Sequence, residues 1–248
     1  MAKLRRFQVD SLATATPGAL VALPEGEAHH ARVLRLASGS AIEVFDSSGR
    51  VAAAKLVSGE NSDLSAEIVS IRTQQNARAE LLLATAWPKG KRAAVLVEKC
   101  SELGVRAILP VRFDRSVVTK DEESEGLSRL RRIAAEAAKQ CGRGDVPDIR
   151  AEQTLLQVIE SAGAETRCVL LDPRAEKTLL ELLENMNADD RPLLLLIGPE
   201  GGFSPEELAL TDARNVSRAR LTQHVLRIET AALAACAIAA AVAFNAKA

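Results

Sequence analysis

The segment LLLLIGPEGGFSPEE, residues Leu193–Glu207, has the pattern of a strand, a glycine-rich loop and the start of a helix. Its apolar beginning is typical of a strand buried on both faces of a parallel sheet. A glycine-rich loop follows, and Ser204, Pro205 and Glu207 then supply an N-cap, a proline at the first helical position and a capping box. In open α/β sheets, ligands bind outside the carboxyl ends of such strands. The loop is therefore either a ligand site or a tight strand-to-helix turn.

The residues of this loop exclude two familiar phosphate-binding motifs. A phosphate loop ends in Gly-Lys-Ser/Thr, and the loop after Ile197 contains no lysine. The dinucleotide fingerprint needs G-x-G-x-x-G at the first strand of its unit, whereas this loop has other spacing and comes late in the chain. Glu200 would also repel a phosphate. The predicted ligand is therefore not a polyphosphate.

The sequence around this stretch alternates between strand and helix patterns, which predicts an α/β domain with a parallel sheet covered on both faces. The expected strands are Leu81–Ala86, Val105–Val111, Cys168–Leu171 and Leu193–Ile197. The expected helices are Arg92–Leu103, Leu127–Cys141, 178–186, 205–214 and 229–244.

The beginning of the chain has a different pattern, with short apolar runs separated by turn residues. This spacing predicts a small β-barrel with one short helix at Glu27–Leu36. The expected strands are Arg6–Val9, Ala19–Leu23, Ser40–Phe45, Val51–Val57 and Leu64–Ile71. We therefore expect an N-terminal domain over residues 1–72, a linker over 73–78 and the α/β domain over 79–248.

A second motif, LTQHVLRIETA at Leu221–Ala231, precedes an alanine-rich helix. Arg227, Glu229 and Thr230 place a cation, an anion and a hydroxyl at the start of that helix. One interpretation is a catalytic group, and the other is that Glu229 and Thr230 cap the positive end of the helix. The small residues that follow would let another backbone approach closely, as a tightly packed or knotted core requires.

Composition and charge limit the classes of function. The chain has 248 residues, 47% hydrophobic and 26% charged, which is typical of a folded globular protein. Its formal net charge is -1, so any contact with nucleic acid must come from local basic patches. The apolar run Ala231–Phe244 is shorter than the roughly 20 residues of a membrane span. With no signal peptide at the start, we expect a cytoplasmic protein.

The cysteines favour neither a metal site nor a disulfide framework. They are Cys100, Cys141, Cys168 and Cys236, far apart and without a CxxC pair. Buried thiols in a reducing compartment are the expectation.

Together, the two motifs resemble the SPOUT methyltransferases, and within them the RsmE family, which methylates N3 of a uridine in small-subunit ribosomal RNA. The segments Ile197–Ser204 and Leu226–Ala231 look like the two cofactor-loop signatures of that family. Further similar segments, covering nearly the whole chain, are Arg6-Phe7, His29-His30, Val33–Arg35, Lys89-Gly90, Glu98-Lys99, Ser101–Val105, Arg115-Ser116 and Ala135–Arg143. The family usually has Leu-Gly and a further arginine where this chain has Leu221-Thr222 and His224.

The resemblance implies a PUA-like barrel, followed by a SPOUT domain with a trefoil knot that holds S-adenosylmethionine, with no metal. It implies a homodimer and, as partner, small-subunit ribosomal RNA or the assembled small subunit. The donor would be held largely by backbone groups. The residues around it would be Leu171, Ile197, Gly198, Pro199, Glu200, Gly201, Gly202, Leu221, Val225, Leu226 and Arg227.

Methylation of uridine N3 needs help from the protein because this nitrogen is largely protonated at neutral pH. Our hypothesis is that Arg227 stabilises the developing anion, and that Glu229 positions it or accepts the proton, with Thr230 beside them. RNA phosphates require basic side chains. The RNA-binding candidates are Arg6, His29, His30, Arg32, Arg35, Lys89, Arg92, Arg115 and Arg143. For the two histidines, packing is an equal alternative.

Two other functions stay open from the sequence. One is a ribosome-assembly factor that keeps the fold and binds RNA without transferring methyl groups. The other is a methyltransferase that acts on another RNA.

Overall fold

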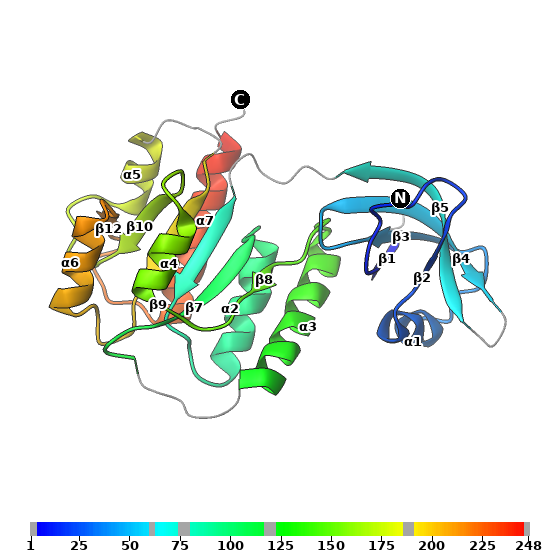
Figure 1. The fold of residues 1–248 in the computed structure, drawn as a ribbon, viewed down its shortest axis with the longest axis horizontal. Coiled ribbons are helices and arrows are strands. Elements are labelled where there is room, and N and C mark those ends of the chain that lie inside the picture. Colours follow the sequence, from blue (N-terminus) through cyan, green and yellow to red (C-terminus); the bar gives the residue numbers. More distant parts are fainter. Residues whose placement is uncertain (1–3, 60–62, 74–79, 117–122, 186–190, 246–248) are drawn as a thin grey trace. The chain divides into compact units, whose positions relative to one another are not determined.

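The structure, a computed structural model, describes residues 4–59, 63–73, 80–116, 123–185 and 191–245 (Figure 1). The chain forms two compact units. One comprises Met1–Asn76 with Ala138–Val146, and the other comprises Ala77–Ala137 with Pro147–Ala248. Apart from Thr73, the predicted linker 73–78 lies outside the described residues, so its position stays a prediction.

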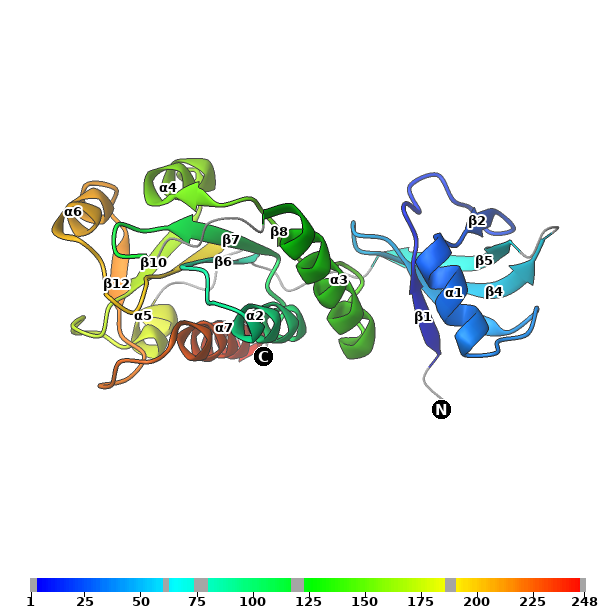
Figure 2. The same cartoon turned by 90° about the horizontal axis from the view of Figure 1, so that it is seen from below.

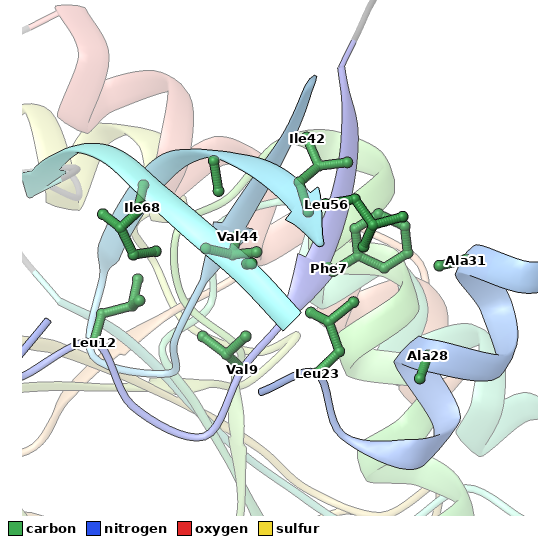
Figure 3. Close-up of a cluster of buried hydrophobic side chains, with 13 residues drawn as sticks. Phe7, Val9, Leu12, Leu23, Ala28, Ala31, Ile42, Val44, Leu56 and Ile68 are labelled. Carbon is green, nitrogen blue, oxygen red and sulfur yellow. The ribbon is translucent and has the colours of Figure 1, made fainter. Parts of the chain in front are cut away.

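The N-terminal unit contains a five-stranded sheet in the order β1-β3-β4-β5-β2. Strand β1 pairs with β3 in parallel, and the other pairs are antiparallel. The strands are β1 (Arg5–Gln8), β2 (Leu20–Ala22), β3 (Ala41–Phe45), β4 (Arg50–Ser58) and β5 (Leu64–Thr73). Alternate side chains of these strands, among them Phe7, Val44 and Leu56, form a buried core (Figure 3).

Helix α1 (Glu25–Val33) covers this core with Ala28 and Ala31 (Figure 3). It ends before the predicted residue Leu36 because Arg35 has a positive φ of 54°. An L residue in this left-handed conformation cannot continue a right-handed helix.

A segment from farther along the chain belongs to the same unit, since Ala138–Val146 clusters with the first residues. Its Lys139 is buried and forms an ion pair with Glu27 of α1. Arg143 forms an ion pair with Asp145, which is 1% exposed. Because a buried charge is costly unless it is paired, the Lys139–Glu27 pair ties the segment to α1, and the Arg143–Asp145 pair neutralises charge within the segment.

The C-terminal unit is built on a seven-stranded parallel sheet in the order β12-β10-β11-β6-β7-β8, with β9 also paired to β7. The strands are β6 (Leu81–Thr85), β7 (Ala107–Arg112), β8 (Asp148–Ile149), β9 (Gln153–Thr154), β10 (Arg167–Leu171), β11 (Leu193–Ile197) and β12 (Ser217–Ala219). Strand β11 is buried along its whole length in the middle of this sheet, as its apolar sequence predicts.

Helices cover both faces of this sheet, which confirms the predicted α/β architecture (Figure 2). The helices are α2 (Lys91–Glu102), α3 (Glu123–Cys141), α4 (Leu155–Ala162), α5 (Leu179–Asn185), α6 (Pro205–Ala213) and α7 (Ile228–Asn245). Helices α2, α5 and α7 lie on one face, and α4 and α6 on the other. Helix α7 packs against α2, α5 and strands β6 and β11. In the described part of the chain, no helix is long and apolar enough to cross a membrane.

Candidate functional site

A cavity of about 330 Å³ lies in the C-terminal unit, at the carboxyl ends of β10 and β11. The donor-binding residues predicted from the sequence line it, apart from Arg227: Leu171, Ile197, Gly198, Pro199, Glu200, Gly201, Gly202, Leu221, Val225 and Leu226. The cavity is also lined by residues outside that predicted set. Phe203, Ile228 and Ala231 belong to the two segments that resemble cofactor loops, and the others are Arg115, Asp172, Pro173, Arg174, Thr222 and His224.

The glycine loop owes its shape to a packed aromatic ring. A Cβ at Gly198 would lie only 2.7 Å from the ring of Phe203. Phe203 is itself buried and packs edge-on against Phe113, with ring centroids 5.5 Å apart. Only glycine fits at position 198 while this ring holds its place, since real Cβ atoms do not approach other atoms so closely.

A carboxylate network anchors the same loop to α6 and to the end of β7. The Ser204 hydroxyl accepts from the Glu207 amide at 3.1 Å, and the Glu207 carboxylate accepts from the Ser204 amide at 2.8 Å. This confirms the predicted capping box. Glu207 also accepts from the Asp114 amide at 2.9 Å, and the Ser204 hydroxyl donates to Asp114 at 2.6 Å. These hydrogen bonds fix the position at which the loop ends and α6 begins.

Arg115 contacts the glycine loop directly. Its Nη1 donates to the carbonyl of Gly201 at 3.0 Å, and the residue lines the cavity. Arg115 was predicted to contact RNA, but its guanidinium lies against the loop predicted to bind the donor.

A buried carboxylate also lines the cavity. Asp172 follows β10 and is 5% exposed. Burial acts to raise the pKa of Asp172, but hydrogen bonds from the side chain and backbone amide of Arg174 outweigh it, so the pKa lies below its ordinary value. This residue was missed, although a polar side chain directly after a buried parallel strand was a usable signal.

The two departures from the family pattern lie on this cavity and contact each other. The Thr222 hydroxyl accepts from the His224 amide at 3.0 Å and donates to the His224 carbonyl at 2.9 Å. The hydroxyl therefore stabilises a local turn at the rim.

Beside the cavity lies a second hollow, lined by Arg92, Glu200, Val225, Leu226 and Arg227. It shares Glu200, Val225 and Leu226 with the first cavity. Predicted catalytic residue Arg227 therefore lies in this hollow rather than in the cavity itself.

The other two predicted catalytic residues begin α7. The Glu229 side chain is 14% exposed, and its Oε2 lies 3.7 Å from Nη1 of Arg92. That separation is an ion-pair distance, and Oε2 has no hydrogen-bond donor among the described residues. Thr230 is exposed.

The remaining RNA-binding candidates differ in exposure. Arg6 is only 6% exposed, pairs with Glu43 at 2.6 Å and stacks over Phe45, which favours a structural role. Burial lowers the pKa of Arg6 and the nearby Glu43 carboxylate raises it, with a net lowering. His30 packs edge-on against Phe7, and the candidates that are exposed are His29, Arg32, Arg35 and Lys89.

No metal centre emerges from the described residues, because no three His, Cys, Asp or Glu side chains are grouped to hold one. The cysteines are all free. Cys100 and Cys236 are buried as expected, whereas Cys141 is exposed and Cys168 is half-buried.

Two models of known protein domains match this chain and define its class. A model of the RNA methyltransferase domain matches residues 75–240, and a model of the RNA methyltransferase PUA domain matches residues 23–69. The parallel sheet with its cavity thus belongs to an RNA methyltransferase of the SPOUT type, preceded by a PUA domain.

Similar proteins of known function narrow this class to one family. Ribosomal RNA small subunit methyltransferase E from Synechocystis sp. is 31% identical over 86% of this chain and 70% of that protein. The protein of that name from Mycobacterium tuberculosis is 30% identical over 92% of this chain and 88% of its own length. The chain therefore belongs to the RsmE family of ribosomal RNA methyltransferases.

Solved structures agree with this assignment. The chain superposes with a TM-score of 0.83 on ribosomal RNA small subunit methyltransferase E from Neisseria gonorrhoeae bound to S-adenosyl methionine, at 26% identity over 95% of this chain and 96% of that one. A putative methyltransferase from Legionella pneumophila, also with bound cofactor SAM, has a TM-score of 0.83 at 28% identity over 96% and 98%.

Proposed function

We propose that the protein transfers the methyl group of S-adenosylmethionine to N3 of a uridine in small-subunit ribosomal RNA. Family membership supports the donor and the ribosomal RNA. One observation about the site carries the choice of chemistry. The cavity lies beside a hollow lined by Arg92 and Arg227, and the Glu229 carboxylate is 3.7 Å from Arg92. A carboxylate at this place could take a proton from an acceptor base.

The residues of the cavity fit the donor. Leu171, Ile197 and Leu226 offer apolar walls, and the glycine loop presents backbone at close range. The Glu200 and Asp172 carboxylates, which would repel a polyphosphate, complement the positive sulfonium. When bound, S-adenosylmethionine supplies an electrophilic methyl group. The trefoil knot around this cavity stays a prediction.

Glu229 suits the proton-accepting role. Its buried Oε2 has no hydrogen-bond donor in the described part of the chain, and such atoms are rare because they cost stability. We propose that the N3–H of the acceptor uridine donates to the Glu229 carboxylate, whose side chain keeps 14% of its surface exposed. The N3 proton then passes to Glu229, the N3 electron pair forms the bond to the methyl carbon, and the electrons of the broken carbon–sulfur bond stay on sulfur.

Arg227 complements this step electrostatically. As N3 loses its proton, negative charge spreads onto the uracil oxygens, and a guanidinium in the same hollow stabilises it. Thr230 keeps its predicted role beside them as a hypothesis.

We further propose that two copies of the chain form the active enzyme in the cytoplasm. Val225 lines the cavity and is 75% exposed, so an apolar side chain beside the donor site is left uncovered in the single chain. A second subunit would cover it. Light scattering tests this directly, and a monomeric mass at micromolar concentration would contradict the proposal.

Transfer itself is tested with labelled S-adenosylmethionine and small ribosomal subunits from a strain that lacks the enzyme. We expect label at N3 of one uridine, with free small-subunit RNA assayed in parallel. Label on another RNA would change the substrate, and donor binding without any transfer would favour the assembly-factor alternative.

A further inference from the structure

Arg92 lies between carboxylates that come from two different elements. Its Nη1 is 3.3 Å from Glu200 Oε1 on the glycine loop and 3.7 Å from Glu229 Oε2 on the first turn of α7. Arg92 itself lies in the first turn of α2, and its side chain is 36% exposed, so water reaches only part of the guanidinium. One guanidinium nitrogen thus contacts both Glu200 of the glycine loop and Glu229, the proposed proton acceptor.

The position of Arg92 allows it to hold the exposed Glu200 near the largely buried Glu229. Helix α2 packs against α7, so the backbone of Arg92 is fixed relative to Glu229. Glu200, by contrast, is 60% exposed on a loop, and Arg92 donates a side-chain hydrogen bond to it. Without the guanidinium the two carboxylates would be left close together and uncompensated, and the exposed one would move away.

We propose that Arg92 is a positioning residue that holds the donor loop and Glu229 in register across the hollow, instead of the RNA phosphate contact predicted from the sequence. This rests on the proposed function for the role of Glu229. Because methyl transfer depends on alignment, a displacement of either group by about 1 Å can lower the rate about 100-fold.

The test compares Arg92→Gln and Arg92→Lys with Arg106→Gln. Arg106 is a matched control, since it is 37% exposed and pairs with Glu80 at 3.8 Å, away from the cavity. We expect Arg92→Gln to lower kcat about 100-fold with KM for RNA changed less than about threefold. Arg92→Lys should recover part of kcat because it restores the charge without the planar fork. Arg106→Gln should behave as wild type.

Two results would overturn the proposal. One is a kcat near that of wild type together with a raised KM for RNA and a salt dependence of binding that falls by about 0.7–0.9 in log–log slope, as loss of one phosphate contact predicts. The other is no change in any parameter. Circular dichroism checks folding, and if Arg92→Gln does not fold, Arg92→Lys and Glu200→Gln carry the comparison.

Donor affinity gives a readout that needs no transfer. By calorimetry, Arg92→Gln and Glu200→Gln should each weaken S-adenosylmethionine binding about tenfold, and the double variant should be no weaker, because the two residues act through one contact. Additive losses would contradict the proposal. If wild type labels some base other than uridine N3, the proposed function fails, while these ratios still decide the role of Arg92.

Discussion

Arg227, which directly precedes α7, and Glu229, in its first turn, carry the proposed chemistry, and their substitution should affect kcat more than donor binding. Glu229→Gln removes the proton acceptor and should lower kcat about 100- to 10,000-fold, the usual contribution of a general base. Arg227→Ala should lower kcat about 100- to 1000-fold by removing charge stabilisation. Single-turnover transfer to small subunits measures both.

The matched control for these variants is Gln223→Ala, an exposed residue of the same segment that does not line the cavity. Donor titration should give the wild-type affinity for Glu229→Gln. Full activity in either Arg227→Ala or Glu229→Gln would remove that residue from the mechanism.

Asp46 shows how one buried carboxylate stabilises the N-terminal unit in a pH-dependent way. It is 2% exposed and accepts from the amides of Leu12, Ser48 and Arg50 and from the Ser48 hydroxyl. Burial acts to raise the pKa of Asp46, but these hydrogen bonds outweigh it and lower the pKa below the ordinary value.

A lowered pKa in the folded state means that the contribution of Asp46 is present above its unfolded pKa of about 3.9 and disappears as the pH falls through the folded value. Asp46→Asn should therefore lower the free energy of unfolding by about 1.5–3 kcal/mol at pH 7. The difference from wild type should shrink near pH 3. Urea unfolding at both pH values measures it, and an equal difference at both would disprove the assignment.

The conformation of the glycine loop between β11 and α6 depends on the packing of one aromatic ring. In Gly198→Ala the new methyl group would meet the Phe203 ring at 2.7 Å, so the ring must leave Phe113 and the loop must move. We expect S-adenosylmethionine affinity to fall at least tenfold, as calorimetry would show. Gly26→Ala in α1 is the control, since a Cβ there meets nothing within 4 Å. Unchanged affinity in Gly198→Ala would mean that the loop adapts freely.

The elements that the sequence predicts well are those whose signal is local. Strand β11 is apolar throughout, and α6 begins with a complete capping box, so both could be placed in advance. Strands β8, β9 and β12 have only two or three residues, which is too short for a periodic pattern. Helix α4 was missed too, although Thr154 and Gln157 form a capping box that could have revealed it.

The sequence predicts the residues of the site that lie within the two motifs and misses those that come from other parts of the chain. Residues within the two motifs line the cavity, because each motif is a continuous segment. Arg115, Asp172 and Arg174 reach the same cavity from other strands, and only the order of the sheet brings them there. The burial of Arg6 likewise depends on Glu43 of a neighbouring strand. Tertiary pairing of this kind leaves no local signal.

The chain has a formal net charge of -1, so its overall electrostatic field does not attract RNA. Binding must then rest on a few exposed cations, among them Arg35 of the N-terminal unit, whose left-handed backbone projects from the end of α1. Arg35→Gln should reduce the log–log salt slope of RNA binding by about 0.7–0.9, the loss of one released counterion. Lys55→Gln, an exposed cation on β4, is the control. Filter binding across a salt series measures the slope, and S-adenosylmethionine affinity should not change. If instead the slope is unaltered while affinity falls, Arg35 reads a base or the RNA shape, and the electrostatic contact must come from other cations.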